Sequence, residues 1–158
     1  MSGPILPPAR VHQINVSPQG GLPKHPVAGP VWVRRQGVEG DFNRYRTEHL
    51  GGDPDSAVLL LPLSTLETLA REGYPVGPGS LGENFTLAGI EEDQLSVGQT
   101  LRLGSLALVQ VSRPCLPCYQ VQIYGTDFLR RIRGHRGAYA RVLEEGPVRT
   151  GDPVFLQG

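Results

Sequence analysis

Short apolar or alternating stretches, separated by turn residues, make up most of the chain. Apolar and polar residues alternate over residues 11–16, as they do in a half-buried strand. The remaining stretches of strand length are residues 31–33, 57–61, 84–87, 101–103, 107–111 and 154–156. Residues 138–143 fit either a helix or a strand, and the alternation of Tyr139, Arg141 and Leu143 favours a strand.

The sequence pattern predicts two helices. The first follows a capping box made by Ser64 and Glu67 and ends at Gly73. The second is capped by Asp127 and ends near Gly134, whereas residues 43–49 are read as a polar stretch after a turn. Many short strands with few helices are typical of β-barrels. The predicted fold is therefore mainly β, a closed or partly open β-barrel with one to three short helices.

The length of 158 residues fits one domain with a proper buried core. We expect a flexible N-terminal tail over residues 1–10 and a single domain over residues 11–158. The 21 Gly and 15 Pro are scattered between the apolar runs, which indicates tight turns rather than disorder.

Charge and targeting signals exclude several classes of function. The 15 basic and 15 acidic residues balance, so no overall field favours nucleic acid or an anionic membrane as a partner. The N-terminus lacks the basic and apolar regions of a secretory signal, and the longest apolar run, residues 57–63, is too short to span a bilayer. A cytoplasmic location is expected.

The two cysteines, Cys115 and Cys118, stand in a Cys-x-x-Cys pair just after a predicted strand. In a reducing compartment such a pair is more often reactive or metal-binding than a structural disulfide. A thioredoxin-like role needs a βαβ context that the pattern lacks. A structural zinc site would need further ligands from the four histidines, His12, His25, His49 and His135, and no second ligand pair has finger-like spacing. Simple packing of two buried thiols also stays open.

Several segments, in order from about residue 11 to 156, resemble the MOSC domain family, named for the C-terminal domain of molybdenum-cofactor sulfurase. The Gly-Glu-Asn motif at residues 82–84 and the Pro-Cys-Tyr motif at residues 117–119 are the most specific. His49 precedes a Gly-Gly pair, with Leu50 as an extra residue relative to the family. The other matching segments are residues 14–17, 20–24, 26–27, 37–41, 55–58, 85–86, 89–90, 97–98, 137–143, 146–148 and 151–152.

The resemblance implies a β-barrel with a cleft that receives molybdenum cofactor (molybdopterin) or a related pterin, or that passes sulfur. The family cysteine, proposed to carry a persulfide or to ligate molybdenum, corresponds to Cys118. Cys115 falls where family members often have Arg, which makes it a candidate resolving thiol. Arg113 is the nearest residue that could replace the lost charge. A thiolate is both a sulfur nucleophile and a soft metal ligand, and nearby cations favour its formation.

A cofactor phosphate needs cationic contacts, and arginine binds planar anions well. The candidates are Lys24, Arg34, Arg44, Arg46, His49 and Arg113. For each one, a solvated polar loop is the alternative. Asn84 could bind a flat heterocycle or fix a turn. The basic residues between 130 and 136 are interpreted as a solvated face, and Trp32 and Tyr139 as core residues.

These residues lead to one main functional hypothesis and two alternatives. The main one is a molybdenum-cofactor protein that reduces N-hydroxylated compounds or transfers sulfur with Cys118, assisted by Cys115. Its partners would be the pterin or a small-molecule substrate, with an electron-donor or sulfur-donor protein. The first alternative is a non-catalytic carrier or binding module for the cofactor, and the lesser one is a structural zinc domain.

Overall fold

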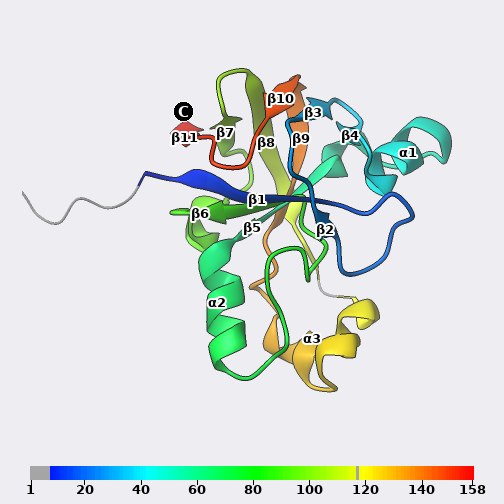
Figure 1. The fold of residues 1–158 in the computed structure, drawn as a ribbon, viewed down its shortest axis with the longest axis vertical. Coiled ribbons are helices and arrows are strands. Elements are labelled where there is room, and N and C mark those ends of the chain that lie inside the picture. Colours follow the sequence, from blue (N-terminus) through cyan, green and yellow to red (C-terminus); the bar gives the residue numbers. More distant parts are fainter. Residues whose placement is uncertain (1–7, 117) are drawn as a thin grey trace, which may run out of the picture.

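A strongly curved, eight-stranded sheet forms the centre of the protein, as a computed structural model that describes residues 8–116 and 118–158 shows (Figure 1). The strand order is β11-β7-β8-β9-β5-β6-β1-β2, and only β5 and β6 run parallel. The bounds are β1 (Arg10–Val16), β2 (His25–Pro26), β5 (Val58–Pro62), β6 (Phe85–Ala88), β7 (Thr100–Leu103), β8 (Ala107–Pro114), β9 (Ala138–Glu144) and β11 (Val154–Gln157).

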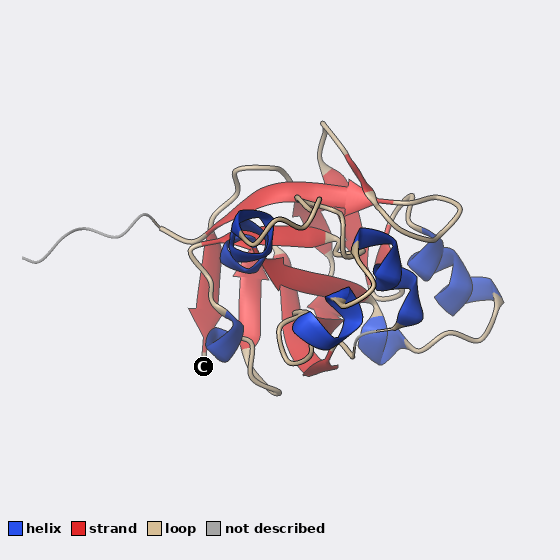
Figure 2. Cartoon of the chain, turned by 90° about the horizontal axis from the view of Figure 1, so that it is seen from below, coloured by secondary structure: helices blue, strands red, loops and turns tan. Residues whose placement is uncertain are grey.

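A smaller three-stranded sheet and short helices complete the fold. The small sheet has the order β10-β3-β4, with β3 (Val31–Arg34), β4 (Gly37–Val38) and β10 (Gly146–Val148). The α-helices are α1 (Phe42–His49), α2 (Leu63–Arg71) and α3 (Phe128–Arg131), and the 3-10 helices are η1 (Pro54–Ser56), η2 (Glu92–Gln94) and η3 (Tyr119–Tyr124). The helices lie outside the sheet, with α1 well separated from α2 and α3 (Figures 1 and 2).

Strands β1 and β11, from opposite sides of the large sheet, approach each other without forming a continuous ladder of hydrogen bonds. The backbone N–H of Val11 in β1 donates to the carbonyl of Asp152 at 2.8 Å, and that of Val154 in β11 donates to Ala9 at 3.0 Å. A single isolated bridge joins Arg10 and Pro153. The mainly β prediction is confirmed. A closed barrel is not found among the described residues, because these contacts involve only the start of β1.

Two clusters of buried side chains hold the fold together. The larger fills the inside of the curved sheet, and its largest fully buried side chains include Phe85, Ile14 and Leu101. The smaller joins α2 to η3 and α3 through Leu66, Phe128 and neighbouring residues. Strand β5 is buried along its whole length because it lies between β9 and β6 at the centre of the sheet.

The strand predictions are confirmed, including the hairpin at Gly104, which has the positive φ of 70° that a tight turn there requires. Three other expectations were wrong. Helix α1 was missed because none of its residues is buried, so its sequence carries no apolar stripe. Trp32 is 41% exposed rather than in the core.

The third wrong expectation concerns the residues that cap the helices, which were predicted to be Ser64 with Glu67 and Asp127. Pro62 is the N-cap of α2, and the Ser64 hydroxyl donates instead to Glu91 at 2.7 Å. At α3, Asp127 is the N-cap, but its carboxylate accepts a hydrogen bond from the Tyr74 hydroxyl rather than from the helix backbone. A true capping box occurs at η2, between Glu91 and Gln94.

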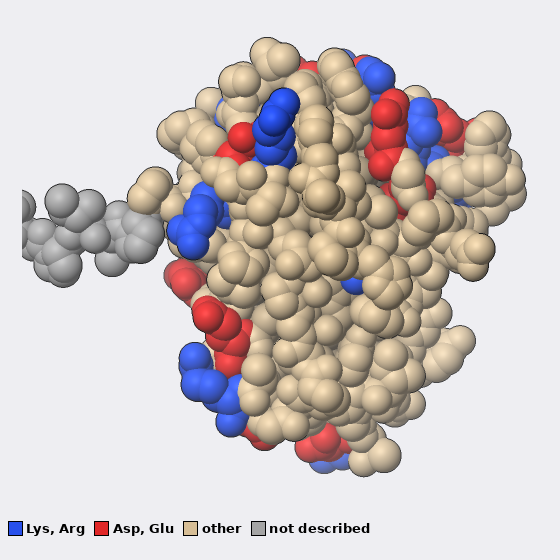
Figure 3. Space-filling view, in the orientation of Figure 1, with Lys and Arg blue, Asp and Glu red and all other residues tan. Residues whose placement is uncertain are grey.

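Residues 1–7 of the expected N-terminal tail lie outside the described residues. Among the helices of the described part of the chain, none combines the length and the apolar character needed to cross a membrane. On the face drawn in Figure 3, charged side chains of both signs gather near the edges and the middle carries few of them, in line with the balanced composition.

Candidate functional site

A cleft of about 150 Å³ brings together residues from six separate segments of the chain. These segments are the loop at residues 20–24, helix α1, strand β5, the loop at residues 81–84, residues 118–120, and residues 136–139 at the start of β9. The side chains that could do chemistry or bind a ligand there are Lys24, Arg46, Asn84, Cys118, Arg136 and Tyr139.

Cys118 is the half-buried thiol of this cleft. It occupies the N-cap position of η3 with an extended backbone, so the chain turns away from the sheet directly after it. Its sulfur makes a weak contact, at 3.9 Å, with the side-chain oxygen of Gln120. A ligand that enters the cleft can therefore contact a thiol that is held only weakly by the described side chains around it.

Cys115 is buried behind the same wall, with 4% of its surface exposed. It directly follows β8, and its backbone N–H donates to the carbonyl of Gly137 at 3.0 Å. The Arg136 guanidinium donates to its sulfur at 3.0 Å. Burial raises the pKa of the Cys115 thiol, and the charge of Arg136 opposes that shift. Pro117, between the two cysteines, lies outside the described residues.

Arg136 is the main site residue that the sequence reading misassigned. It was interpreted as part of a solvated basic face, yet only 7% of it is exposed. Its two terminal nitrogens donate to the carbonyls of Leu116 at 3.1 Å and Leu81 at 3.0 Å. Its Nε is buried and has no hydrogen-bond partner among the described residues. Such a group costs free energy unless something outside the chain satisfies it.

Tyr139 was expected in the core and instead forms part of the cleft wall. Burial, followed by its interaction with Cys115, raises the pKa of its hydroxyl to about 12. The hydroxyl is therefore neutral at physiological pH and can donate a hydrogen bond there.

Lys24 and Asn84 both contact the buried carboxylate of Asp41. The Lys24 ammonium lies 2.6 Å from Asp41 Oδ2, and the Asn84 side-chain N–H donates to the same oxygen at 3.0 Å. Asn84 also accepts from the backbone N–H of Leu59 and donates to the carbonyl of Asn15. Its amide groups are thus used within the protein, an arrangement that favours the structural interpretation over heterocycle binding.

The cleft carries positive charge because two of its arginines lack a carboxylate partner. Among the described residues, neither Arg46 nor Arg136 forms an ion pair, whereas the charge of Lys24 is balanced by Asp41. Arg46 is exposed and stacks on the ring of Phe42, with its guanidinium carbon 5.1 Å from the ring centre. One cation at the rim and one deep in the wall suit an anionic ligand.

The other predicted anion contacts lie away from this cleft. Arg34 pairs with Glu39 at 2.9 Å and stacks on Trp32. Arg44 pairs with Glu48, and His49 stacks on Tyr45, both beside a separate hollow along α1. Arg113 contacts Ser56 and stacks on Tyr139, so its charge is not beside Cys118 as expected. The cation that contacts the thiol pair is Arg136, whose guanidinium donates to the Cys115 sulfur.

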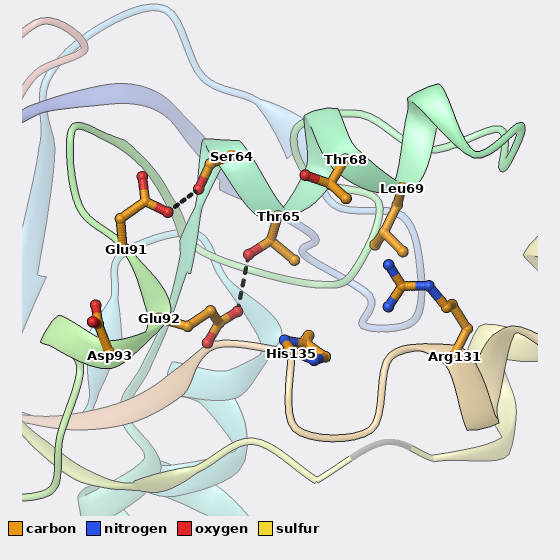
Figure 4. A pocket seen from close by; sticks show the side chains of 9 residues that line it. All are labelled: Ser64, Thr65, Thr68, Leu69, Glu91, Glu92, Asp93, Arg131 and His135. Atoms are coloured by element: carbon orange, nitrogen blue, oxygen red, sulfur yellow. Dashed lines mark hydrogen bonds between the residues drawn. The ribbon is translucent and has the colours of Figure 1, made fainter.

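A second, larger cavity of about 530 Å³ lies on the outer side of α2 (Figure 4). Ser64 and Thr65 point from the helix toward Glu91 and Glu92 and bond to them, and His135 faces Glu92 from the opposite side. None of the predicted thiol or cofactor contacts lines this cavity, although His135, considered above as a possible zinc ligand, does. Within residues 8–116 and 118–158, no group of three or more His, Cys, Asp or Glu could hold a metal, so the zinc hypothesis has no ligand set there.

Comparisons with known proteins agree with this architecture. The uncharacterized protein YflK of Bacillus subtilis (strain 168) is 35% identical over 144 residues, which cover 86% of this chain and 62% of YflK. The chain thus spans less than two thirds of that relative. The crystal structure of YiiM from Geobacillus stearothermophilus has a TM-score of 0.76 and 33% identity, covering 96% of this chain and 76% of that chain.

A more partial relative is a protein named reductase from Gibberella moniliformis (strain M3125 / FGSC 7600). It is 30% identical over 82 residues, which cover 49% of this chain and 15% of that protein. The family model described as MOSC domain matches residues 46–155, which include the end of α1, Asn84, both cysteines and Arg136. With most of its length matched in this way, the chain belongs to the MOSC domain family.

Proposed function

We propose that the protein binds molybdenum cofactor in the Cys118 cleft and uses this thiol as a molybdenum ligand or a persulfide carrier. The observation that supports this most strongly is that one cleft contains a half-buried thiol and two arginines without a carboxylate partner among the described residues. A thiolate is a soft ligand that suits a metal–sulfur group, and arginine suits the phosphate of a pterin.

The residues present fit such a group on chemical grounds. Arg136 places a guanidinium in the cleft wall that has no carboxylate partner among the described residues, and a bound anion would balance its charge. Arg46 would hold the same anion from the rim, and Cys118 would face the metal. When bound, the cofactor supplies two-electron redox chemistry at molybdenum. The chain contributes the thiol, the positive wall and the neutral hydroxyl of Tyr139.

Of the two reactions, reduction of an N-hydroxylated compound and sulfur transfer, we favour the reduction. The partial relative named reductase supports the redox option over sulfur delivery. Reduction of a hydroxylamine to an amine releases water and consumes two electrons and two protons. An electron-donor protein is therefore part of the proposal, and a sulfur-donor protein would replace it if Cys118 carries a persulfide.

The second candidate is a non-catalytic carrier of the cofactor. The observation that favours it is the small size of the cleft, about 150 Å³, which leaves little room for a substrate beside a bound pterin. To separate the two, the protein is purified from a host that makes the cofactor. Molybdenum is then assayed, and reduction of a hydroxylaminopurine is measured with a chemical electron donor.

Bound molybdenum with turnover supports the enzyme, and bound molybdenum without turnover supports the carrier. A protein that takes up neither molybdenum nor pterin from this host would contradict both.

A further inference from the structure

We propose that Cys115 is the resolving thiol for a persulfide on Cys118, so that the pair releases the carried sulfur as hydrosulfide. This rests on the persulfide form of the proposed function. It would give the cleft a second activity, sulfide release, beyond holding a cofactor.

The step is an ordinary thiol–disulfide exchange. The Cys115 thiolate attacks the inner sulfur of the Cys118 persulfide, a new sulfur–sulfur bond forms between the two cysteines, and the outer sulfur leaves as hydrosulfide. The proton of the Cys115 thiol passes to solvent or to the leaving hydrosulfide. No electrons are gained or lost overall. A cellular thiol such as glutathione, or a dithiol protein, then supplies the two electrons that reduce the disulfide.

The two thiols differ in burial, as expected if Cys118 receives the sulfur and Cys115 resolves the persulfide. Cys118 is half-buried in an open cleft, whereas Cys115 is 4% exposed. A sulfur donor in solution can reach Cys118 and cannot reach Cys115. Burial also raises the pKa of Cys115, which keeps it protonated and unreactive toward reagents in solution. Loading at Cys118 therefore comes first.

The residues that surround Cys115 also line the cleft, so the buried thiol adjoins the space where the persulfide would lie. Arg136 lines the cleft and donates to the Cys115 sulfur at 3.0 Å. Tyr139 also lines the cleft, and its interaction with Cys115 contributes, after burial, to the raised pKa of the tyrosine hydroxyl. The Cys-x-x-Cys spacing is the one with which thiol–disulfide oxidoreductases close a disulfide between neighbouring cysteines.

Arg136 supplies the charge that the exchange requires. Its contact with the Cys115 sulfur stabilises the attacking thiolate once the proton has left. The positive charge of its guanidinium in the cleft wall also favours the departing hydrosulfide anion. The carbonyl of Gly137 fixes the backbone of Cys115 through the 3.0 Å bond, which holds the thiol against this cation.

The test uses the full chain, reduced and freed of small thiols, then mixed with glutathione persulfide. Sulfide release is followed with an electrode, and intact mass is measured without reductant. The wild type should release sulfide stoichiometrically and end two hydrogens lighter than the reduced protein. Cys115→Ser should keep one extra sulfur on Cys118 and release sulfide at least about tenfold more slowly. Cys115→Ala repeats the test without a hydroxyl, and thermal melting shows that each variant is folded.

Two results distinguish a failure of Cys115 as the resolving thiol from a failure of the proposed persulfide on Cys118. If the wild type keeps its extra sulfur as long as Cys115→Ser does, Cys115 does not resolve the persulfide and the inference is wrong, although the persulfide carrier stands. If neither protein takes up sulfur at Cys118, the persulfide form of the proposed function fails and the inference fails with it.

Discussion

The ammonium of Lys24 lies 2.6 Å from the carboxylate of Asp41 in the wall of the cleft, and the Asp41 side chain is fully buried. Asp41 also accepts the backbone N–H of Ser17 at 2.9 Å and the amide of Asn84. The pair therefore joins the loop after β1 to the start of α1 and to the Gly-Glu-Asn loop. Removing one partner would leave the other charge buried and unpaired.

Lys24→Met should lower the free energy of unfolding by about 3 kcal/mol, because it leaves the Asp41 carboxylate buried without its cation. Urea denaturation measures this change. In a double-mutant cycle, Asp41→Asn with Lys24→Met should cost less than the sum of the two single changes. Strictly additive costs would mean that the two side chains do not interact.

Arg136→Gln should weaken binding of an oxidised pterin phosphate by about tenfold or more, since a charged hydrogen bond contributes about 1.5–3 kcal/mol. Calorimetric titration measures the affinity. Arg133→Gln removes the same charge from an exposed position nearby and serves as the matched control. Equal losses in both variants would point to a general effect of net charge rather than to a contact in the cleft.

Glu83 should make stability depend on pH. Its side chain is fully buried, and burial raises its pKa above the ordinary carboxyl value. It accepts bonds from Gly79 and Thr86 through one oxygen, and the other oxygen has no partner among the described residues. At low pH it is protonated in both the folded and unfolded states, and as the pH rises the unfolded state ionises first, which destabilises the fold.

Glu83→Gln keeps an acceptor for both bonds but cannot ionise. Its unfolding free energy should therefore rise relative to that of the wild type as the pH increases above the ordinary carboxyl pKa of 4.5. Urea titrations at several pH values measure the difference. A difference that stays constant over this rise in pH would show that Glu83 titrates normally in the folded protein.

Gly137→Ala should destabilise the protein by more than about 4 kcal/mol, because a Cβ there would lie 2.0 Å from the Leu60 carbonyl oxygen. Gly134 has nearly the same positive φ, 80° against 76°, with open space around it. Gly134→Ala should cost only the backbone penalty of about 1 kcal/mol. Thermal or urea unfolding compares the two, and similar costs would contradict the close approach of β5 to Gly137.

The strands were predictable because their apolar periodicity is local in sequence. Alternation over residues 11–16 and 138–143 appears directly as β1 and β9, and Gly104 marks the hairpin between β7 and β8. Helix α1 carries no such signal, since it buries no residue. The near closure of the sheet depends on backbone bonds between the start of β1 and residues 151–154, which no local pattern records.

Of the candidate site residues, the structure brings Lys24, Arg46, Asn84 and Cys118 to one cleft and puts Cys115 behind it. Arg136 was missed because its importance comes from long-range packing. The start of β9 lies against the end of β8, which carries Arg136 to Cys115. Within the sequence, Arg136 looks like one more member of a basic run, and only its position between two glycines could have suggested a buried turn.

Cys118 is the residue at which we propose that molybdenum cofactor binds. The most direct test of this claim is the molybdenum and pterin content per chain of wild type, Cys118→Ala and Cys115→Ala, each purified from a host that makes the cofactor. We predict bound cofactor in the wild type, at least about a tenfold loss in Cys118→Ala and a smaller loss in Cys115→Ala. Equal cofactor content in wild type and Cys118→Ala would contradict the claim.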